Sequence, residues 1–97
     1  MNKLSNRLKA IVKFVDKKDS IVDVGCDHGY LSIYLVENKL VKKVIASDIN
    51  QNALNSAINN IKKSNLDIET VLSDGIKDVS LKGINTLVIS GMGTSTI

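Results

Sequence analysis

The chain has 97 residues, 43% of them apolar, and carries a formal net charge of +3. This length allows one domain with a thin core, and the composition indicates a folded chain. No run of about 20 apolar residues is present, which excludes a membrane-spanning helix. The polar start lacks the apolar core of a signal peptide. The single cysteine, Cys26, cannot form an internal disulfide, so we expect a cytoplasmic protein.

Positive charge is concentrated near the N-terminus. The first twenty residues contain six basic residues and only two acidic ones. The basic residues are Lys3, Arg7, Lys9, Lys13, Lys17 and Lys18. Apolar residues repeat at helical spacing over about 4–16, which predicts a basic amphipathic helix within residues 1–18. Such a helix either contacts a phosphate backbone or presents a solvated face, and charge alone leaves both readings open.

Strands and helices alternate along the rest of the chain. The predicted elements are a strand over Ser20–Val24, a buried helix over Tyr30–Glu37, a strand over Lys43–Ser47, a helix over 51–64, and strands over Ile68–Ser73 and Ile84–Ser90. Asp48 or Asn50 is the expected cap of the second of these helices. The alternation indicates an α/β fold with a parallel sheet covered on both faces. We expect these residues to form the first half of a larger doubly wound domain.

The strongest motif, Asp23-Val-Gly25-Cys-Asp27-His28-Gly29-Tyr, lies between the first strand and the following helix. Gly25 permits a sharp turn, and Gly29 permits close approach of a ligand to the helix start. The glycine spacing is not that of a dinucleotide site, and two acids nearby would repel a pyrophosphate. They suit a ligand that carries an ammonium and a sulfonium, which favours S-adenosylmethionine over NAD.

Three further polar clusters follow strand ends. Asp48 is placed to accept hydrogen bonds from ribose hydroxyls, although an aspartate there is equally a helix cap. Asp74, before Gly75, is placed to accept from an adenine amine, although Asp-Gly is also an ordinary turn. Ser90-Gly-Met-Gly permits close approach of a substrate base. Ligands of open parallel sheets bind along the carboxyl edge of the strands, so the coincidence of four clusters there predicts a site.

These residues resemble the motif series of class I methyltransferases. Asp-x-Gly-x-Asp-His-x-Tyr-Leu, with Leu4-Ser-x-Arg7-Leu before it, Asn60 in Ala-Ile-Asn-Asn, and Ser90-Gly-Met-Gly at the end, resembles the bacterial tRNA (adenine-22-N1) methyltransferases. Two positions depart from the patterns. Asp27 stands where the general first motif has a glycine, and Thr94 stands where the tRNA family has one.

The resemblance implies a Rossmann-like sheet with strand order 3-2-1-4 and an N-terminal helix. It implies S-adenosylmethionine as cofactor and tRNA as partner, with methyl transfer to N1 of adenine 22. The cofactor-binding residues it implies are Asp23, Gly25, His28, Gly29, Asp48, Ile49, Asp74, Gly75 and Ser90. The residues it places near the reacting base are Asp27, Gly91 and Met92, and the residues for RNA contact are Lys3 and Arg7.

Proteins of the resembling family are longer, so we expect the remainder of the domain and a helical C-terminal domain to be missing. We expect this piece alone to be inactive, and to self-associate through an exposed fourth strand. Two alternatives stay open: a class I methyltransferase with another substrate, and a non-catalytic nucleotide-binding module. No spacing of His, Cys and Asp indicates a metal.

Overall fold

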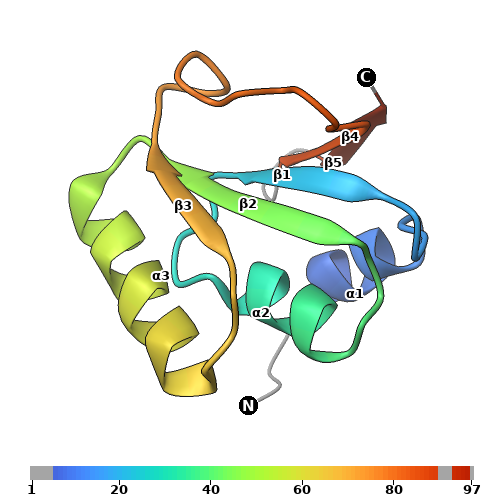
Figure 1. Cartoon of the computed structure of the whole chain (residues 1–97), viewed down its shortest axis with the longest axis horizontal. Helices are drawn as coiled ribbons and strands as arrows, with labels where there is room; N and C mark the ends of the chain where they lie inside the picture. The colour runs from blue at the N-terminus through green and yellow to red at the C-terminus, as the bar shows by residue number, and fades with distance from the viewer. Residues whose placement is uncertain (1–5, 90–92, 97) are drawn as a thin grey trace.

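The computed structural model describes residues 6–89 and 93–96. Its elements are α1 (Asn6–Val12), β1 (Ser20–Val24), α2 (Tyr30–Glu37), β2 (Lys43–Asp48), α3 (Gln51–Ser64), β3 (Glu69–Leu72), β4 (Thr86–Ile89) and β5 (Gly93–Thr96). The strands form one sheet in the order β3-β2-β1-β4-β5 (Figure 1). β1 pairs in parallel with β2 and β4, and β2 pairs in parallel with β3, so the predicted order 3-2-1-4 is confirmed. None of the helices in the described ranges is long and apolar enough to cross a membrane.

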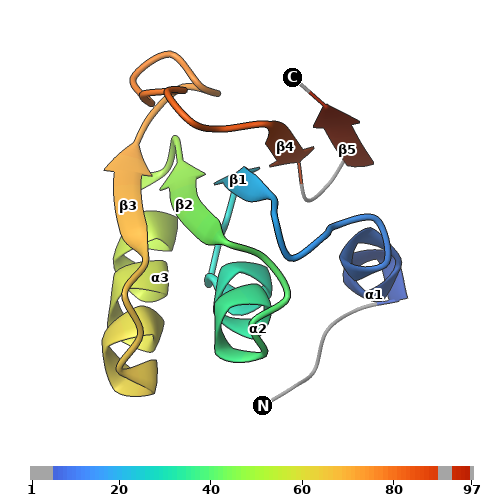
Figure 2. The same ribbon diagram turned by 45° about the vertical axis from the view of Figure 1, so that its right-hand side comes forward.

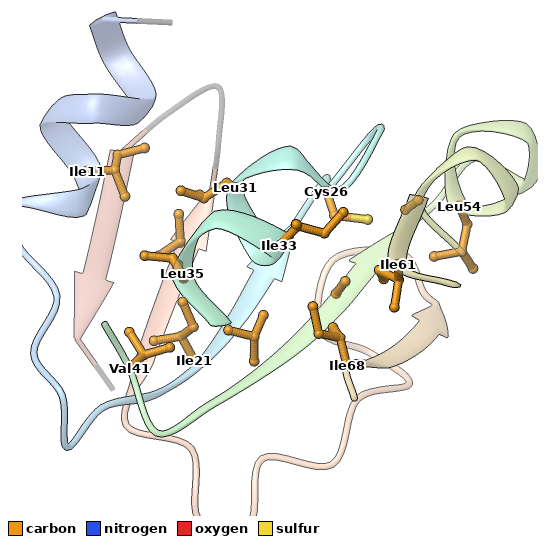
Figure 3. Packing of buried hydrophobic residues seen from close by; sticks show 14 residues of the cluster. Ile11, Ile21, Cys26, Leu31, Ile33, Leu35, Val41, Leu54, Ile61 and Ile68 are labelled. Carbon is orange, nitrogen blue, oxygen red and sulfur yellow. The ribbon is translucent and has the colours of Figure 1, made fainter. Parts of the chain in front are cut away.

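The three helices pack against one face of the sheet (Figure 2). Side chains of a strand alternate between the two faces, so every second strand residue meets the helices. Ile21 of β1 lies in this core with Leu35 of α2 and Ile61 of α3 (Figure 3). Ile11 attaches α1 to the same core and is only 4% exposed. Burial of such side chains contributes about 1.5–3 kcal/mol each, so this layer fixes the helices against the sheet.

The other face of the sheet is covered by the segment 73–85, which connects β3 to β4 (Figures 1 and 2). Val22 and Ile45 pack there in a smaller cluster with Val79 and Ile84 of that segment. The sequence pattern predicts a sheet covered on both faces, and the two clusters confirm it. In the described part of the chain, helices cover one face and the segment 73–85 covers the other, because the connection between β3 and β4 is built from turns.

The first helix ends earlier than predicted. α1 ends at Val12, and the chain continues in a tighter turn in which the Phe14 N–H donates to the Ile11 carbonyl at 2.9 Å. The Asp16 carboxylate then accepts from the Lys18 N–H at 2.9 Å. Aspartate favours such local side-chain bonds over continued helix, which explains why the apolar periodicity overestimates the helix.

The fourth strand is paired on its outer side, although the sequence predicts an unpaired edge over Ile84–Ser90. β5 runs antiparallel to β4, with Ile89 opposite Gly93 and Thr86 opposite Thr96. The expectation is wrong because β5 takes up the outer hydrogen-bonding groups of β4. Self-association through an exposed fourth strand therefore loses its structural basis.

Candidate cofactor site

The loop between β1 and α2 contains three left-handed residues at alternate positions. The φ angles are 73° at Gly25, 53° at Asp27 and 79° at Gly29. The N–H groups of Gly25 and Cys26 both donate to the carbonyl of Ser47, at 2.9 and 2.8 Å. The loop therefore bends over the end of β2, which is where the sequence places a site.

Asp48 joins this loop to the start of α3. Its Oδ2 accepts from the Asp27 N–H and its Oδ1 from the Asn50 N–H, each at 2.9 Å. The cap of α3 is Asn50, whose side chain accepts from the Ala53 N–H at 3.0 Å. Of the two capping candidates, Asn50 is therefore the right one. Asp48 is 8% exposed, and its ribose contact stays a prediction.

Asp23 is fully buried, unlike Asp27, the other acid of the motif. Its carboxylate accepts from the Ser32 hydroxyl at 2.7 Å and so ties β1 to α2. Asp23 thus supports the site from inside the fold, and its role in cofactor binding stays a prediction.

Cys26 belongs to the same loop, and its side chain is buried. Burial raises the pKa of its thiol from 9.0 to about 12, and the negative charges of Asp23, Asp48 and Asp27 act in the same direction as burial. The thiolate is the reactive form of cysteine, so this side chain is an inert packed group.

Asp27 and His28 project from the loop toward solvent, with 69% and 51% of their side chains exposed. His28 Nε2 lies 3.9 Å from Asp27 Oδ1. The ring of Tyr30 lies beside the imidazole, with 5.3 Å between ring centroids. An exposed acid, an imidazole and a phenol therefore meet at the start of α2, and the sequence interpretation does not assign Tyr30 to the site.

Two residues of α3 that sequence reasoning leaves without a role also contact this loop. Ser56 Oγ lies 2.8 Å from His28 Nδ1, and Asn60 Nδ2 donates to the His28 carbonyl at 2.8 Å. The sequence indicates Asn60 only through the family resemblance. The spacing of four residues, which puts both side chains on one helical face, is the available signal.

Gly29 has a tighter environment than expected. A side-chain Cβ at this position would lie 3.1 Å from the Cβ of Ala57 on α3. The glycine is required by helix packing and by its positive φ, and the neighbour that approaches it is α3. Contact of a ligand with its backbone stays a prediction.

The end of β3 forms the turn that an Asp-Gly pair predicts. The Lys77 N–H donates to the Asp74 carbonyl at 3.2 Å, and Gly75 has a φ of 64°. Asp74 remains exposed, so its carboxylate is accessible to a ligand. Ile49, beyond β2, is 66% exposed as well. Their roles in binding stay predictions.

Four predicted residues, Lys3, Ser90, Gly91 and Met92, lie outside the described residues. Arg7 lies on α1, with its side chain outside the described part of the structure. The described part of the site thus includes three acids at the carboxyl ends of three adjacent parallel strands, of which Asp27 and Asp74 are exposed and Asp48 is 8% exposed. Such a row can accept hydrogen bonds from the hydroxyls and amines of a cationic nucleoside ligand.

The comparison with protein families identifies the class to which this fold and its acidic edge belong. The chain belongs to the "Methyltransferase domain" family, whose model matches residues 4–97.

Among curated relatives, the chain is 31% identical over 97 residues to the tRNA (adenine(22)-N(1))-methyltransferase of Bacillus subtilis, covering 98% of this chain and 41% of the relative. It is 36% identical over 81 residues to the ribosomal protein L11 methyltransferase of Thermotoga neapolitana, covering 82% of this chain and 29% of the relative. The chain thus spans less than half the length of either relative.

A solved structure, M. capricolum TrmK in complex with S-adenosyl-homocysteine, is similar as well. It superposes with a TM-score of 0.77 at 43% sequence identity, covering 91% of this chain and 39% of that one.

Proposed function

We propose that this chain is the S-adenosylmethionine-binding part of a methyltransferase that modifies N1 of adenine 22 in tRNA. The observation that carries the proposal is the acidic carboxyl edge, where Asp48 is fixed between the loop after β1 and the start of α3. The similarity to the tRNA (adenine(22)-N(1))-methyltransferase of B. subtilis supports the choice of substrate.

The residues present fit this cofactor. Asp48, with some exposed surface at the end of β2, is the acceptor for the ribose hydroxyls, and the exposed Asp74 is the acceptor for the adenine amine. Gly25, His28, Gly29, Ile49, Gly75 and Ser90 complete the proposed set. The cofactor, when bound, supplies a methyl group on a positively charged sulfur. Asp27, which is exposed, and the buried Asp23 and Asp48 make the surroundings negative, which suits that charge.

The chain's part in the reaction is to position groups. Adenine N1 lies inside a Watson–Crick pair, so the base must be unpaired or flipped out before it meets the donor. The exposed Asp27 carboxylate can accept from the N6 amine of such a base and so orient N1. Gly91 and Met92 are proposed to line the same region. Alignment of the two reacting atoms is the main source of acceleration in such a displacement.

For tRNA contact we propose α1, with Lys3 and Arg7 as initial candidates. The described surface adds a hollow between α1 and α2, which Lys9, Val12, Lys13 and Tyr34 line. Lysines beside an aromatic ring suit a phosphate backbone and an unpaired base. With tRNA as substrate, we place the protein in the cytoplasm.

A second candidate function is methylation of a ribosomal protein, because the chain is also similar to a ribosomal protein L11 methyltransferase. We favour tRNA because the tRNA relative matches 98% of the chain and the L11 relative 82%.

Calorimetric titration of the chain with S-adenosylhomocysteine, with NAD as control, tests the cofactor. The chain is expected to bind S-adenosylhomocysteine and not NAD. Preferential binding of NAD would contradict the proposal. Methyl transfer by the whole protein to unmodified tRNA, compared with ribosomal protein, tests the substrate. A product other than N1-methyladenine at position 22 would contradict that part.

A further inference from the structure

Three residues of helix α3 contact the loop after β1. Asn60 Nδ2 donates to the His28 carbonyl at 2.8 Å, and Ser56 Oγ lies 2.8 Å from His28 Nδ1. Between them in sequence, Ala57 packs against Gly29, where a Cβ would come within 3.1 Å. Backbone, ring and glycine of the loop are therefore each fixed by a different residue of the same helix.

These contacts hold the loop in a backbone conformation that is unfavourable for a residue with a side chain. Asp27 has a φ of 53°, in the left-handed region that residues other than glycine rarely adopt. Such conformations persist only where the surroundings determine them. Asp48 fixes Asp27 from the side of β2, and Asn60 fixes the next residue from the side of α3.

α3 is itself well placed to serve as a rigid support. Asn50 caps its start, and Leu54, Ala57 and Ile61 are buried against the sheet. A helix anchored in this way transmits its position to whatever its exposed face holds. Ser56 and Asn60 are only partly buried, so they lie between this core and the solvent-exposed loop.

We propose that Asn60 and Ser56 are positioning residues for cofactor binding. Asn60 fixes the backbone of the Asp27–His28 segment, and Ser56 fixes the orientation of the His28 ring. The exposed Asp27 and His28 side chains are therefore preorganised for the ligand before it binds. This inference rests on the proposed function, because it assigns the two residues to the same cofactor site.

The test measures the dissociation constant for S-adenosylhomocysteine in the 97-residue chain and its variants. Asn60→Leu keeps the size of the side chain and removes the donor, and it should raise the dissociation constant about tenfold. Asn60→Gln keeps an amide donor and should recover most of this loss. Asn59→Leu changes the exposed neighbour on the same helix and serves as the matched control. Ser56→Ala, a milder change, should raise the constant about threefold.

A second measurement separates positioning from general stability. Amide hydrogen exchange of Asp27 and Gly29 in the ligand-free chain should become faster in Asn60→Leu, while the urea midpoint and the protection of β1 and β2 stay close to those of Asn59→Leu. Uniform loss of protection with a lower midpoint would show a structural role and overturn the inference. So would an Asn60→Leu affinity equal to that of Asn59→Leu.

The two proposals fail in different ways. If the unmodified chain does not bind S-adenosylhomocysteine, the proposed function is contradicted and the inference falls with it. If the unmodified chain binds and Asn60→Leu binds S-adenosylhomocysteine as tightly as Asn59→Leu does, the inference alone is overturned.

Discussion

The carboxylate of Asp48 accepts a hydrogen bond from the backbone N–H of Asp27, 2.9 Å away, although 21 residues separate them in sequence. The bond joins the end of β2 to the loop after β1, two of the four places where the sequence indicates ligand contacts. An acid that organises the loop and also faces the ligand edge affects binding in two ways.

We predict that Asp48→Ala weakens binding of S-adenosylhomocysteine by roughly 1.5–3 kcal/mol, the scale for hydrogen bonds to a charged group. The loss combines the ribose contact with the support of Asp27. Calorimetry measures it, and Asp67→Ala, which removes an exposed acid ahead of β3, is the control. Asn50→Ala should instead cost about 1 kcal/mol of folding stability through removal of the cap, with a smaller effect on binding. Unchanged affinity in Asp48→Ala with an intact fold would leave Asp48 without a ligand role.

We predict that the basic surface of α1 binds RNA. Lys9 and Lys13 line the hollow next to Tyr34. The double change Lys9→Glu/Lys13→Glu should weaken tRNA binding and reduce the salt dependence by about one ion for each phosphate that the variant no longer neutralises. Arg7→Ala should act in the same direction. Fluorescence anisotropy against salt concentration, in the whole protein, measures both quantities.

The control for this prediction is Lys62→Glu/Lys63→Glu, the same charge change on exposed residues in the last turn of α3. It should have a clearly smaller effect on tRNA affinity. Equal effects of the two double variants would mean that net charge matters and that the face of α1 does not. Binding of S-adenosylhomocysteine should be the same in all of them.

We predict that Gly29→Ala destabilises the fold more than Gly75→Ala does. Both glycines have positive φ, but only Gly29 has a close neighbour, Ala57. Gly75→Ala should cost about 1 kcal/mol from the backbone alone, and Gly29→Ala about 2 kcal/mol or more. Urea unfolding measures both.

A double-mutant cycle with Ala57→Gly identifies the cause. Ala57→Gly alone should cost about 1 kcal/mol of helix propensity. The double variant Gly29→Ala/Ala57→Gly should lose less stability than the sum of the two single variants. The reason is that the Ala57 Cβ, which the new methyl group would contact, is absent. Strict additivity would show that contact with the Ala57 Cβ adds nothing to the cost.

We predict that Cys26 stays a neutral thiol through the physiological range, because burial holds its pKa at about 12. In the unfolded chain the thiol titrates near 9.0. The stability contributed by this difference is fully present below pH 9.0 and is lost as pH rises toward the folded value, because the unfolded chain releases the proton first.

Two measurements check this. Alkylation of Cys26 at pH 8 should be slow in the folded chain and fast in urea. The free energy of unfolding, followed upward from pH 9, should fall less steeply in Cys26→Ala than in the unmodified chain. Rapid alkylation of the folded chain would contradict the burial of the thiol.

The order of the elements and the edge at which the site lies follow from the sequence alone. Apolar runs such as Ser20–Val24 and Lys43–Asp48 are strands, and the helices between them force parallel pairing, which puts their carboxyl ends together. Local chemistry is also sufficient for the turns, since Gly25 and the Asp74-Gly75 pair supply the positive φ of a glycine where the chain turns. Such features depend on residues near one another in the chain, so the sequence pattern predicts them.

The contacts between residues far apart in the chain follow from the tertiary structure. The bond between Asp48 and Asp27, the burial of Asp23 against Ser32, and the contacts of His28 with α3 depend on how the elements pack together. The pairing of β5 along β4 has no signal in the sequence either, because a short polar segment has no periodicity that predicts a strand. Long-range contacts depend on packing and on the hydrogen-bonding groups that packing brings within reach. The local spacing of residues in the sequence predicts neither of these.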